Sequence, residues 1–259
     1  MVVRGILFIA LFGLVACTET DAPKTSSDPI RITDRKPVAF SGRQPASYPV
    51  RGMDAARFQT FVDWTRAKAA GIEFVFLKAT EGGDLKDPKF RDHWRGAGRA
   101  GIARGAYHFY YFCTAPDVQA KWFIRNVPRS QGALPPVLDM EWNPFSPTCQ
   151  RRPDGTTVRA EMRVWLNSVE AAFGQRPIIY TTPGFYKDAD LSRLKGYEFW
   201  LRTTSKRPEE AYPGQPWRFW QYTATGGLPN TPGNIDINVF NGSRADWEAW
   251  RTRRRRSPT

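Results

Sequence analysis

Residues 134–141 read Leu-Pro-Pro-Val-Leu-Asp-Met-Glu. The apolar approach predicts an interior strand, which we place at 136–141. Side chains two apart on a strand point to the same face, so Asp139 and Glu141 lie together while Met140 faces the other way. Interior acids are costly unless they are used, and two neighbouring acids raise the pKa of one of them, which suits a proton donor. Such pairs also bind metals or lie exposed, so the motif alone does not decide.

Outward from this stretch, short apolar runs alternate with helical patterns, and no internal linker is evident. The other strand candidates are 50–54, 73–79, 104–110, 177–181, 198–202, 218–222 and 235–240, and the helical patterns are 58–70, 87–100, 115–126 and 156–173. Alternation of this kind indicates a parallel sheet. The pattern predicts a single α/β barrel of the TIM-like type with an irregular last third. An open doubly wound sheet is disfavoured because no Gly-rich phosphate loop follows the first strand.

Polar residues recur at the ends of these strands, where barrels of this kind carry their active sites. They are Asp54, Lys78, Thr80, Glu81, Tyr107, His108, Asp139, Glu141, Tyr180, Arg202, Gln221, Tyr222 and Asp236. Barrel closure would bring the eighth strand beside the first, so Asp236 is expected near Asp54. The aromatic rings of Tyr107, Tyr180, Trp220 and Tyr222 either contact a ligand at the strand ends or pack the barrel. We expect His108 to be a hydrogen-bonding scaffold residue, because no metal-ligand spacing surrounds it.

The N-terminus has the form of a targeting segment. Arg4 precedes an apolar stretch over 5–16 that is too short to span a bilayer, and Cys17 follows. Leu14-Val15-Ala16-Cys17 is similar to the bacterial lipobox. We therefore expect a signal peptide at 1–16, lipidation of Cys17, and a flexible tether over 17–48 rich in Thr, Ser, Asp, Pro and Lys. The alternatives are a plain signal peptide and a buried helix.

The other end of the chain is strongly basic. Of a formal net charge of +13, five charges come from the arginines at 251 and 253–256. A run of like charges is typical of a solvated tail, so we expect a barrel domain over 49–245 and a basic tail over 246–259. No nucleic-acid-binding motif accompanies the arginines. An exported protein meets an oxidising compartment, so Cys113 and Cys149, which follow neighbouring strands, are a candidate disulfide; two free thiols are the alternative.

Six motifs, in order along residues 50–242, resemble those of glycoside hydrolase family 25, the Chalaropsis-type lysozymes. They are Gly52-Met53-Asp54 through Gln59, Lys78-Ala79-Thr80-Glu81-Gly82, Gly105-Ala106-Tyr107-His108-Phe109, Asp139-Met140-Glu141, Trp220-Gln221-Tyr222 and Asp236-Ile237-Asn238. Ala56 stands where the family often has Ser. The resemblance implies a (β/α)5(β)3 barrel and hydrolysis of the β-1,4 bond between N-acetylmuramic acid and N-acetylglucosamine in peptidoglycan.

By position, the resemblance makes Glu141 the general acid and places Asp54, Asp139 and Asp236 beside it. The expected substrate-binding residues are Lys78, Glu81, Tyr107, Tyr180, Trp220, Gln221 and Tyr222. Asp139 would either stabilise developing positive charge or orient the substrate's 2-acetamido group as an internal nucleophile. No metal or organic cofactor is implied. The expected partners are peptidoglycan and, through the N-terminal lipid, a membrane, with the protein monomeric, exported and at the periplasmic face of an outer membrane if the host has one.

Two other functions stay open at this point. One is a non-catalytic peptidoglycan-binding lipoprotein on the same barrel, for which a missing acid would be the sign; all four acids are present. The other is a basic interaction protein that uses the arginine tail to bind nucleic acid or anionic lipid. Removing residues 251–259 would abolish binding in that case and leave wall lysis unchanged in the enzyme.

Overall fold

The computed structural model describes residues 1–2 and 30–255. The expected signal peptide and Cys17 lie outside the described residues, except for the first two residues of the former. No helix of the described chain is long and apolar enough to cross a membrane.

Eight strands close into a barrel in the order expected from the sequence. They are β2 (Arg51–Ala55), β3 (Ile72–Glu81), β5 (Ala103–Phe109), β6 (Val137–Met140), β7 (Ile178–Thr181), β8 (Glu198–Arg202), β9 (Phe219–Leu228) and β10 (Thr231–Phe240). The strands from β2 to β9 run parallel, whereas β10 is antiparallel to both β9 and β2. The short strands β1 (Thr33–Asp34) and β4 (Leu85–Lys86) pair with β9 and β3 outside the closed ring.

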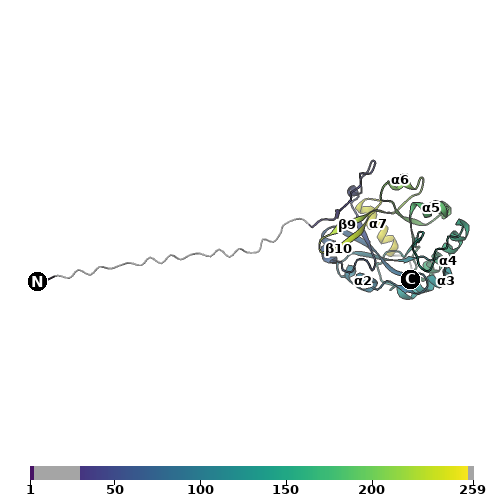
Figure 1. Ribbon diagram of the computed structural model, residues 1–259, viewed down its shortest axis with the longest axis horizontal. Helices are drawn as coiled ribbons and strands as arrows, with labels where there is room; N and C mark the ends of the chain where they lie inside the picture. The colour runs from purple at the N-terminus through teal and green to yellow at the C-terminus, as the bar shows by residue number, and fades with distance from the viewer. Residues whose placement is uncertain (3–29, 256–259) are drawn as a thin grey trace.

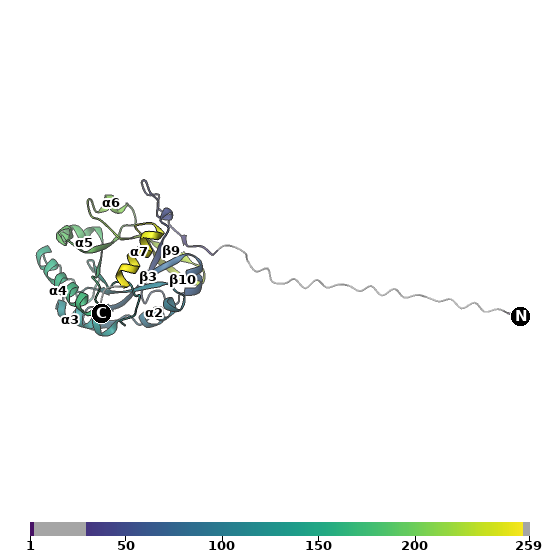
Figure 2. The ribbon, with the colours of Figure 1, turned by 180° about the vertical axis from the view of Figure 1, so that it is seen from behind.

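Helices cover the outside and one end of the barrel, and the longest of them, α4, follows the fourth barrel strand. They are α1 (Trp64–Ala69), α2 (Phe90–Arg99), α3 (Pro116–Asn126), α4 (Gly155–Phe173), α5 (Pro183–Asp188), α6 (Pro208–Ala211) and α7 (Arg244–Arg255), with 3-10 turns at Pro45–Ser47 and Leu191–Arg193. In Figures 1 and 2, α2 to α6 lie along the rim of the molecule and α7 lies inside that ring. The shortness of α5 and α6 agrees with the expected irregular last third.

Alternation along each strand divides the core into two layers. Inward-facing rings such as Phe74, Phe76, Trp200, Phe219 and Phe240 fill the barrel, and the opposite faces pack against the helices. Gly52 is required by this filling, because a side chain on it would overlap the ring of Phe74. The barrel interior is therefore filled by packed aromatic rings, which lie below the carboxyl ends of the strands.

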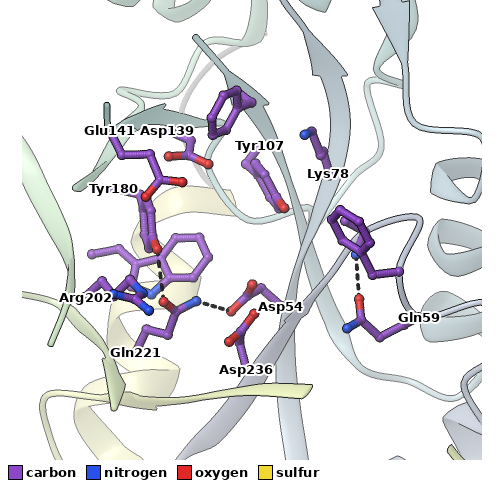
Figure 3. A pocket seen from close by; sticks show the side chains of 14 residues that line it. Asp54, Gln59, Lys78, Tyr107, Asp139, Glu141, Tyr180, Arg202, Gln221 and Asp236 are labelled. Atoms are coloured by element: carbon purple, nitrogen blue, oxygen red, sulfur yellow. Dashed lines mark hydrogen bonds between the residues drawn. The ribbon is translucent and has the colours of Figure 1, made fainter. Parts of the chain in front are cut away.

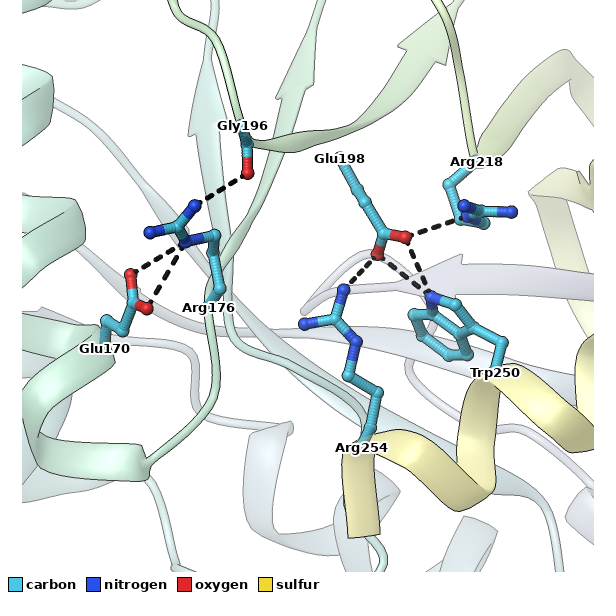
Figure 4. A network of polar contacts seen from close by, with 7 residues as sticks. All are labelled: Glu170, Arg176, Gly196, Glu198, Arg218, Trp250 and Arg254. Atoms are coloured by element: carbon cyan, nitrogen blue, oxygen red, sulfur yellow. Dashed lines mark hydrogen bonds and ion pairs between the residues drawn. The ribbon is translucent and has the colours of Figure 1, made fainter. Parts of the chain in front are cut away.

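The C-terminal segment closes the opposite end of the barrel, which corrects the tail expected from residue 246. Trp247 and Trp250, three residues apart on α7, are buried against the interior rings and stack on each other with centroids 5.5 Å apart. Glu198 at the start of β8 accepts hydrogen bonds from the indole nitrogen of Trp250 and pairs with Arg218 and Arg254, as Figure 4 shows. Burial of Trp247 and Trp250 holds α7 against the barrel, although the arginines on the same helix repel one another.

The chain before the barrel also differs from the expected tether, in its part from Thr33 onward. β1 adds a strand to the hairpin formed by β9 and β10, with Thr33 opposite Gly227. Phe40 and Tyr48 are buried against the outer face of Trp220. Residues 33–48 are held by backbone pairing at β1 and by the rings of Phe40 and Tyr48. Because these contacts are few and separate, the apolar residues of this stretch follow no helical or strand repeat.

Candidate active site

Four carboxyl groups gather at the carboxyl end of the parallel strands, in a pocket of about 420 Å³ (Figure 3). Asp54 comes from β2, Asp139 and Glu141 from the end of β6, and Asp236 from β10. The pocket is lined by Asp54, Ala56, Phe58, Gln59, Lys78, Tyr107, Phe109, Asp139, Glu141, Tyr180, Trp200, Arg202, Gln221 and Asp236. The same-face placement of Asp139 and Glu141 expected from their spacing is what the structure has.

Asp54 and Asp236 form one half of the acidic cluster. Asp236 lies directly opposite Asp54 in the β10–β2 register, and both carboxyl groups line the pocket. Asp54 Oδ2 also accepts hydrogen bonds of 2.8 Å from Gln221 Nε2 and Asn238 Nδ2. Burial, followed by the charge of Asp236, raises the pKa of Asp54 well above its usual value.

Asp139 and Glu141 form the other half, and their surroundings differ. Asp139 is more deeply buried, and its Oδ1 atom has no hydrogen-bond donor. Burial, followed by the neighbouring charge of Glu141, raises the pKa of Asp139 well above its usual value. Burial also raises the pKa of Glu141, although the charges of Arg202 and Lys78 oppose that rise. Both carboxyl groups therefore hold a proton more tightly than free acids do, and Glu141 is the one that reaches further into the pocket.

Two cationic side chains, Lys78 and Arg202, line the pocket, and neither forms an ion pair with any of the four acids. Lys78 Nζ lies 2.5 Å from Glu81 Oε2, and Glu81 Oε1 accepts a hydrogen bond from Tyr111. Although burial opposes its ionisation, Lys78 and Tyr111 lower the pKa of Glu81 below its usual value. Glu81 is thus not a pocket-lining residue but the partner that positions Lys78. Arg202 faces the pocket, and its guanidinium group forms no hydrogen bond or ion pair with the described residues.

The expected substrate-binding residues divide by strand alternation. Lys78, Tyr107, Tyr180 and Gln221 line the pocket, and the Tyr180 hydroxyl donates to Gln221 Oε1 over 2.9 Å. Trp220 and Tyr222 do not, which corrects the expectation for them. Because Gln221 points inward, its two neighbours point outward, where Trp220 donates to the carbonyl of Thr203 and its ring packs against Phe40.

Sequence reasoning did not assign three side chains that line the pocket, Phe58, Phe109 and Trp200, and it placed Arg202 at a strand end without giving it a role. The available signal for Trp200 and Arg202 was period two along β8, which puts Glu198, Trp200 and Arg202 on one face. Phe58 is 72% exposed in the loop after β2, and its exposure is visible only in the structure.

His108 acts as a scaffold residue in the described structure. It is fully buried, lies 2.8 Å from the hydroxyl of Thr80 through Nδ1, and lies 3.1 Å from Gln119 Oε1 through Nε2. Burial lowers the pKa of His108 to about 4, so the ring is neutral at physiological pH. Within residues 1–2 and 30–255, no group of three or more His, Cys, Asp or Glu side chains is arranged to hold a metal ion.

A disulfide ties two of the loops around the pocket. Cys113 and Cys149, which follow β5 and β6, are bonded with their Cα atoms 5.7 Å apart. This confirms the pairing expected from their places after neighbouring strands. The bond fixes the loop that follows Glu141 to the loop that carries Tyr111, the partner of Glu81.

The model of the Glycosyl hydrolases family 25 matches residues 53–231, a span that contains Asp54, Asp139 and Glu141. The chain belongs to this family. Asp236 lies just beyond the matched span, on the strand that pairs with β2. The fold and the family expected from the six motifs are therefore confirmed.

Named relatives of this family-25 chain cover most of its length. It is 34% identical over 231 residues to the uncharacterized protein YegX of Escherichia coli (strain K12), covering 86% of this chain and 82% of that one. It is 36% identical over 208 residues to Lysozyme M1 of Streptomyces globisporus, covering 76% and 69%.

Solved structures agree with the architecture. A family 25 glycosyl hydrolase from Bacillus anthracis superposes with a TM-score of 0.74 at 32% identity, covering 80% of this chain and 95% of that one. The bacterial lysozyme of Streptomyces coelicolor superposes with a TM-score of 0.71 at 31% identity, covering 80% and 99%.

Proposed function

We propose that this protein is a lysozyme that hydrolyses the β-1,4 bond between N-acetylmuramic acid and N-acetylglucosamine in peptidoglycan. The observation that carries the proposal is the buried pair Asp139 and Glu141, with raised pKa values, at the floor of an open pocket. A carboxyl group that keeps its proton near neutral pH is what protonation of a departing sugar oxygen requires. The family and its lysozyme relatives support the same substrate class.

Glu141 is the proposed proton donor. Its side chain is longer than that of Asp139 and extends into the pocket, so it can reach a glycosidic oxygen there. Protonation lets the sugar–oxygen bond break as the ring gains oxocarbenium character. The charges of Arg202 and Lys78 then stabilise the carboxylate that Glu141 becomes, because both oppose the rise in its pKa.

Asp139 faces the same reacting centre from a more enclosed position. Two roles suit it: stabilising the developing positive charge on the ring, or holding the substrate's 2-acetamido group so that its oxygen attacks the anomeric carbon. Asp54 and Asp236 complete the negative potential of the pocket from the seam between β2 and β10. The aromatic side chains of Phe58, Phe109 and Trp200 offer apolar faces to sugar rings.

Digestion of purified peptidoglycan, with identification of the new reducing end, tests this function. Wild-type protein is expected to release muramic acid ends. Glu141→Gln is expected to lose about 10²–10⁴-fold in turnover, the usual contribution of a general acid, and to melt no lower than wild type. The exposed Glu248→Gln is the matched control and should digest normally. Glucosamine ends would indicate a different hydrolase, and binding without release would indicate a non-catalytic binding protein.

We also propose that the enzyme is exported and anchored by lipid at Cys17. The basis is the apolar stretch over 5–16 followed by a lipobox-like sequence. β1 joins the domain at the β9–β10 hairpin, the end of the barrel that carries the pocket, so a lipid tether would hold the pocket toward the membrane side of the wall. Cys17→Ala should move the protein from the membrane fraction to the soluble fraction; an unchanged membrane fraction would exclude lipid anchoring at this residue.

A further inference from the structure

A second polar pocket lies at the opposite end of the barrel from the four acids. It has a volume of about 410 Å³ and is formed where the end of α2, the start of β5, the loop before β6, and α7 meet. Its lining residues are Gly98, Gly101, Ile102, Ala103, Arg104, Gln131, Gly132, Ala133 and Arg251. No acidic side chain is among them.

Arg104 is the central feature of this pocket, and nothing in the described chain neutralises it. Its guanidinium group forms no hydrogen bond and no ion pair with residues 1–2 or 30–255, and its Nε atom is buried without an acceptor. The guanidinium lies over the ring of Trp94 with its central carbon 4.9 Å from the centroid. A side chain at Gly98 would overlap Arg104, so the glycine is what allows the guanidinium to lie flat on α2.

Arg251 brings a second guanidinium to the same pocket from another element. Its Nε atom is also buried without an acceptor, and it stacks on the ring of Trp247 at 5.4 Å. Its one acidic neighbour is the exposed Glu248, at 3.4 Å. Two guanidinium groups on separate elements, each fixed against an indole ring, form a rigid cationic cradle and not a pair of mobile surface arginines.

The rim of the pocket leaves room for a ligand. Gly101 and Gly132 have positive φ values of 69° and 75°, and a side chain at Gly101 would project into open space. A phosphate group presents several acceptor oxygens and can bridge two arginines, whereas a carboxylate is satisfied by one bidentate arginine. The chemistry of the cradle therefore matches a phosphate-bearing anion.

We propose that the pocket formed by Arg104 and Arg251 binds a phosphate group, at a site separate from the acidic pocket. The two sites lie at opposite ends of the barrel, with the aromatic interior and α7 between them. A phosphate-bearing surface or polymer held there leaves the acidic pocket open to substrate. The high positive charge of the chain adds long-range attraction to such a ligand.

Titration calorimetry of the full chain with inorganic phosphate, at constant ionic strength set by chloride, tests the site. Arg104→Gln and Arg251→Gln should each weaken phosphate binding about tenfold, because each removes a charge-assisted contact. Arg193→Gln removes the same charge from an exposed side chain elsewhere and should bind as wild type does. The melting temperature of each arginine variant without phosphate shows whether the variant folds. If one variant fails to fold, the other still tests the site.

Vesicles identify the source of the phosphate. Binding to phosphatidylglycerol but not phosphatidylcholine vesicles, lost in Arg104→Gln, would make it a lipid headgroup; phosphate binding without vesicle binding would make it a soluble or polymer-borne phosphate. Equal phosphate binding by wild type and both variants, or no binding by wild type, would overturn the proposal. Glu141→Gln should bind phosphate normally, and Arg104→Gln should digest peptidoglycan normally. The two variants therefore distinguish an error in the proposed phosphate site from an error in the proposed lysozyme activity.

Discussion

Asp236 lies directly opposite Asp54 across the seam where the antiparallel strand β10 closes the barrel against β2. Residues 182 positions apart in the chain thus meet in one pocket, where burial raises the pKa of both carboxyl groups and the charge of Asp236 raises that of Asp54 further. Asn238, two residues further along β10, faces the same side and donates to Asp54. The seam is therefore both the closure of the fold and a wall of the proposed active site.

Asn238→Ala should destabilise the protein through this seam. Asn238 donates to Asp54 Oδ2 over 2.8 Å and accepts from the indole nitrogen of Trp200 over 2.8 Å. Removing the amide leaves both partners buried with one hydrogen bond fewer, at a cost of about 1–3 kcal/mol for each unsatisfied group. Urea unfolding measures the loss, with the exposed Asn167→Ala on α4 as the control. Equal free energies of unfolding for the two variants would contradict this account of the seam.

The seam also illustrates what the sequence allows to be predicted. Strand positions follow from apolar runs, and the meeting of Asp54 and Asp236 follows from barrel closure. The direction of β10 does not follow, because a short Gly- and Pro-rich connection fits either a hairpin or an irregular crossover. The hairpin puts Asp236 at the start of the part of β10 that pairs with β2, so it reaches the same end of the barrel as acids that lie near the ends of parallel strands.

Two errors in the sequence predictions have distinct physical reasons. Trp220 and Tyr222 were expected at the pocket together with Gln221, although adjacent residues on a strand point to opposite faces. The C-terminal arginines were taken to mark a solvated tail, although Trp247 and Trp250 lie on one face of the same helix. In each case, the spacing of side chains along the strand or helix predicts which of them are buried better than residue type or net charge does.

Asp139→Asn should change how stability depends on pH. Burial raises the pKa of Asp139 in the folded state above its value of about 3.9 in an unfolded chain. The folded state therefore binds the extra proton between these two pKa values, and wild-type stability falls as the pH rises through that window. The variant lacks this loss, so its melting temperature should gain on wild type between pH 3 and pH 8, by about 2–4 °C per kcal/mol.

Thermal unfolding of both proteins across that pH range measures the effect of Asp139→Asn. Asp92→Asn is the control, because Asp92 lies exposed on α2 beside Arg95 and has no buried charge to relieve. A melting-temperature difference that is constant with pH would show that Asp139 does not carry a raised pKa. The activity of Asp139→Asn should fall sharply, which would make Asp139 a residue at which stability and function oppose each other.

Phe58→Ala should weaken substrate binding more than turnover. The ring lines the pocket while being 72% exposed, and an apolar side chain so open to water has a partner only when a sugar ring covers it. Loss of one such contact, about 0.5–1.5 kcal/mol, predicts a rise in KM of about 2- to 10-fold with kcat nearly unchanged. Phe61→Ala is the matched control, because Phe61 lies in the same loop and is 57% exposed but does not line the pocket. Steady-state kinetics on soluble peptidoglycan fragments measures both variants. If Phe61→Ala raised KM as much as Phe58→Ala, the effect would belong to the loop as a whole, and the ring of Phe58 would have no specific contact with the glycan.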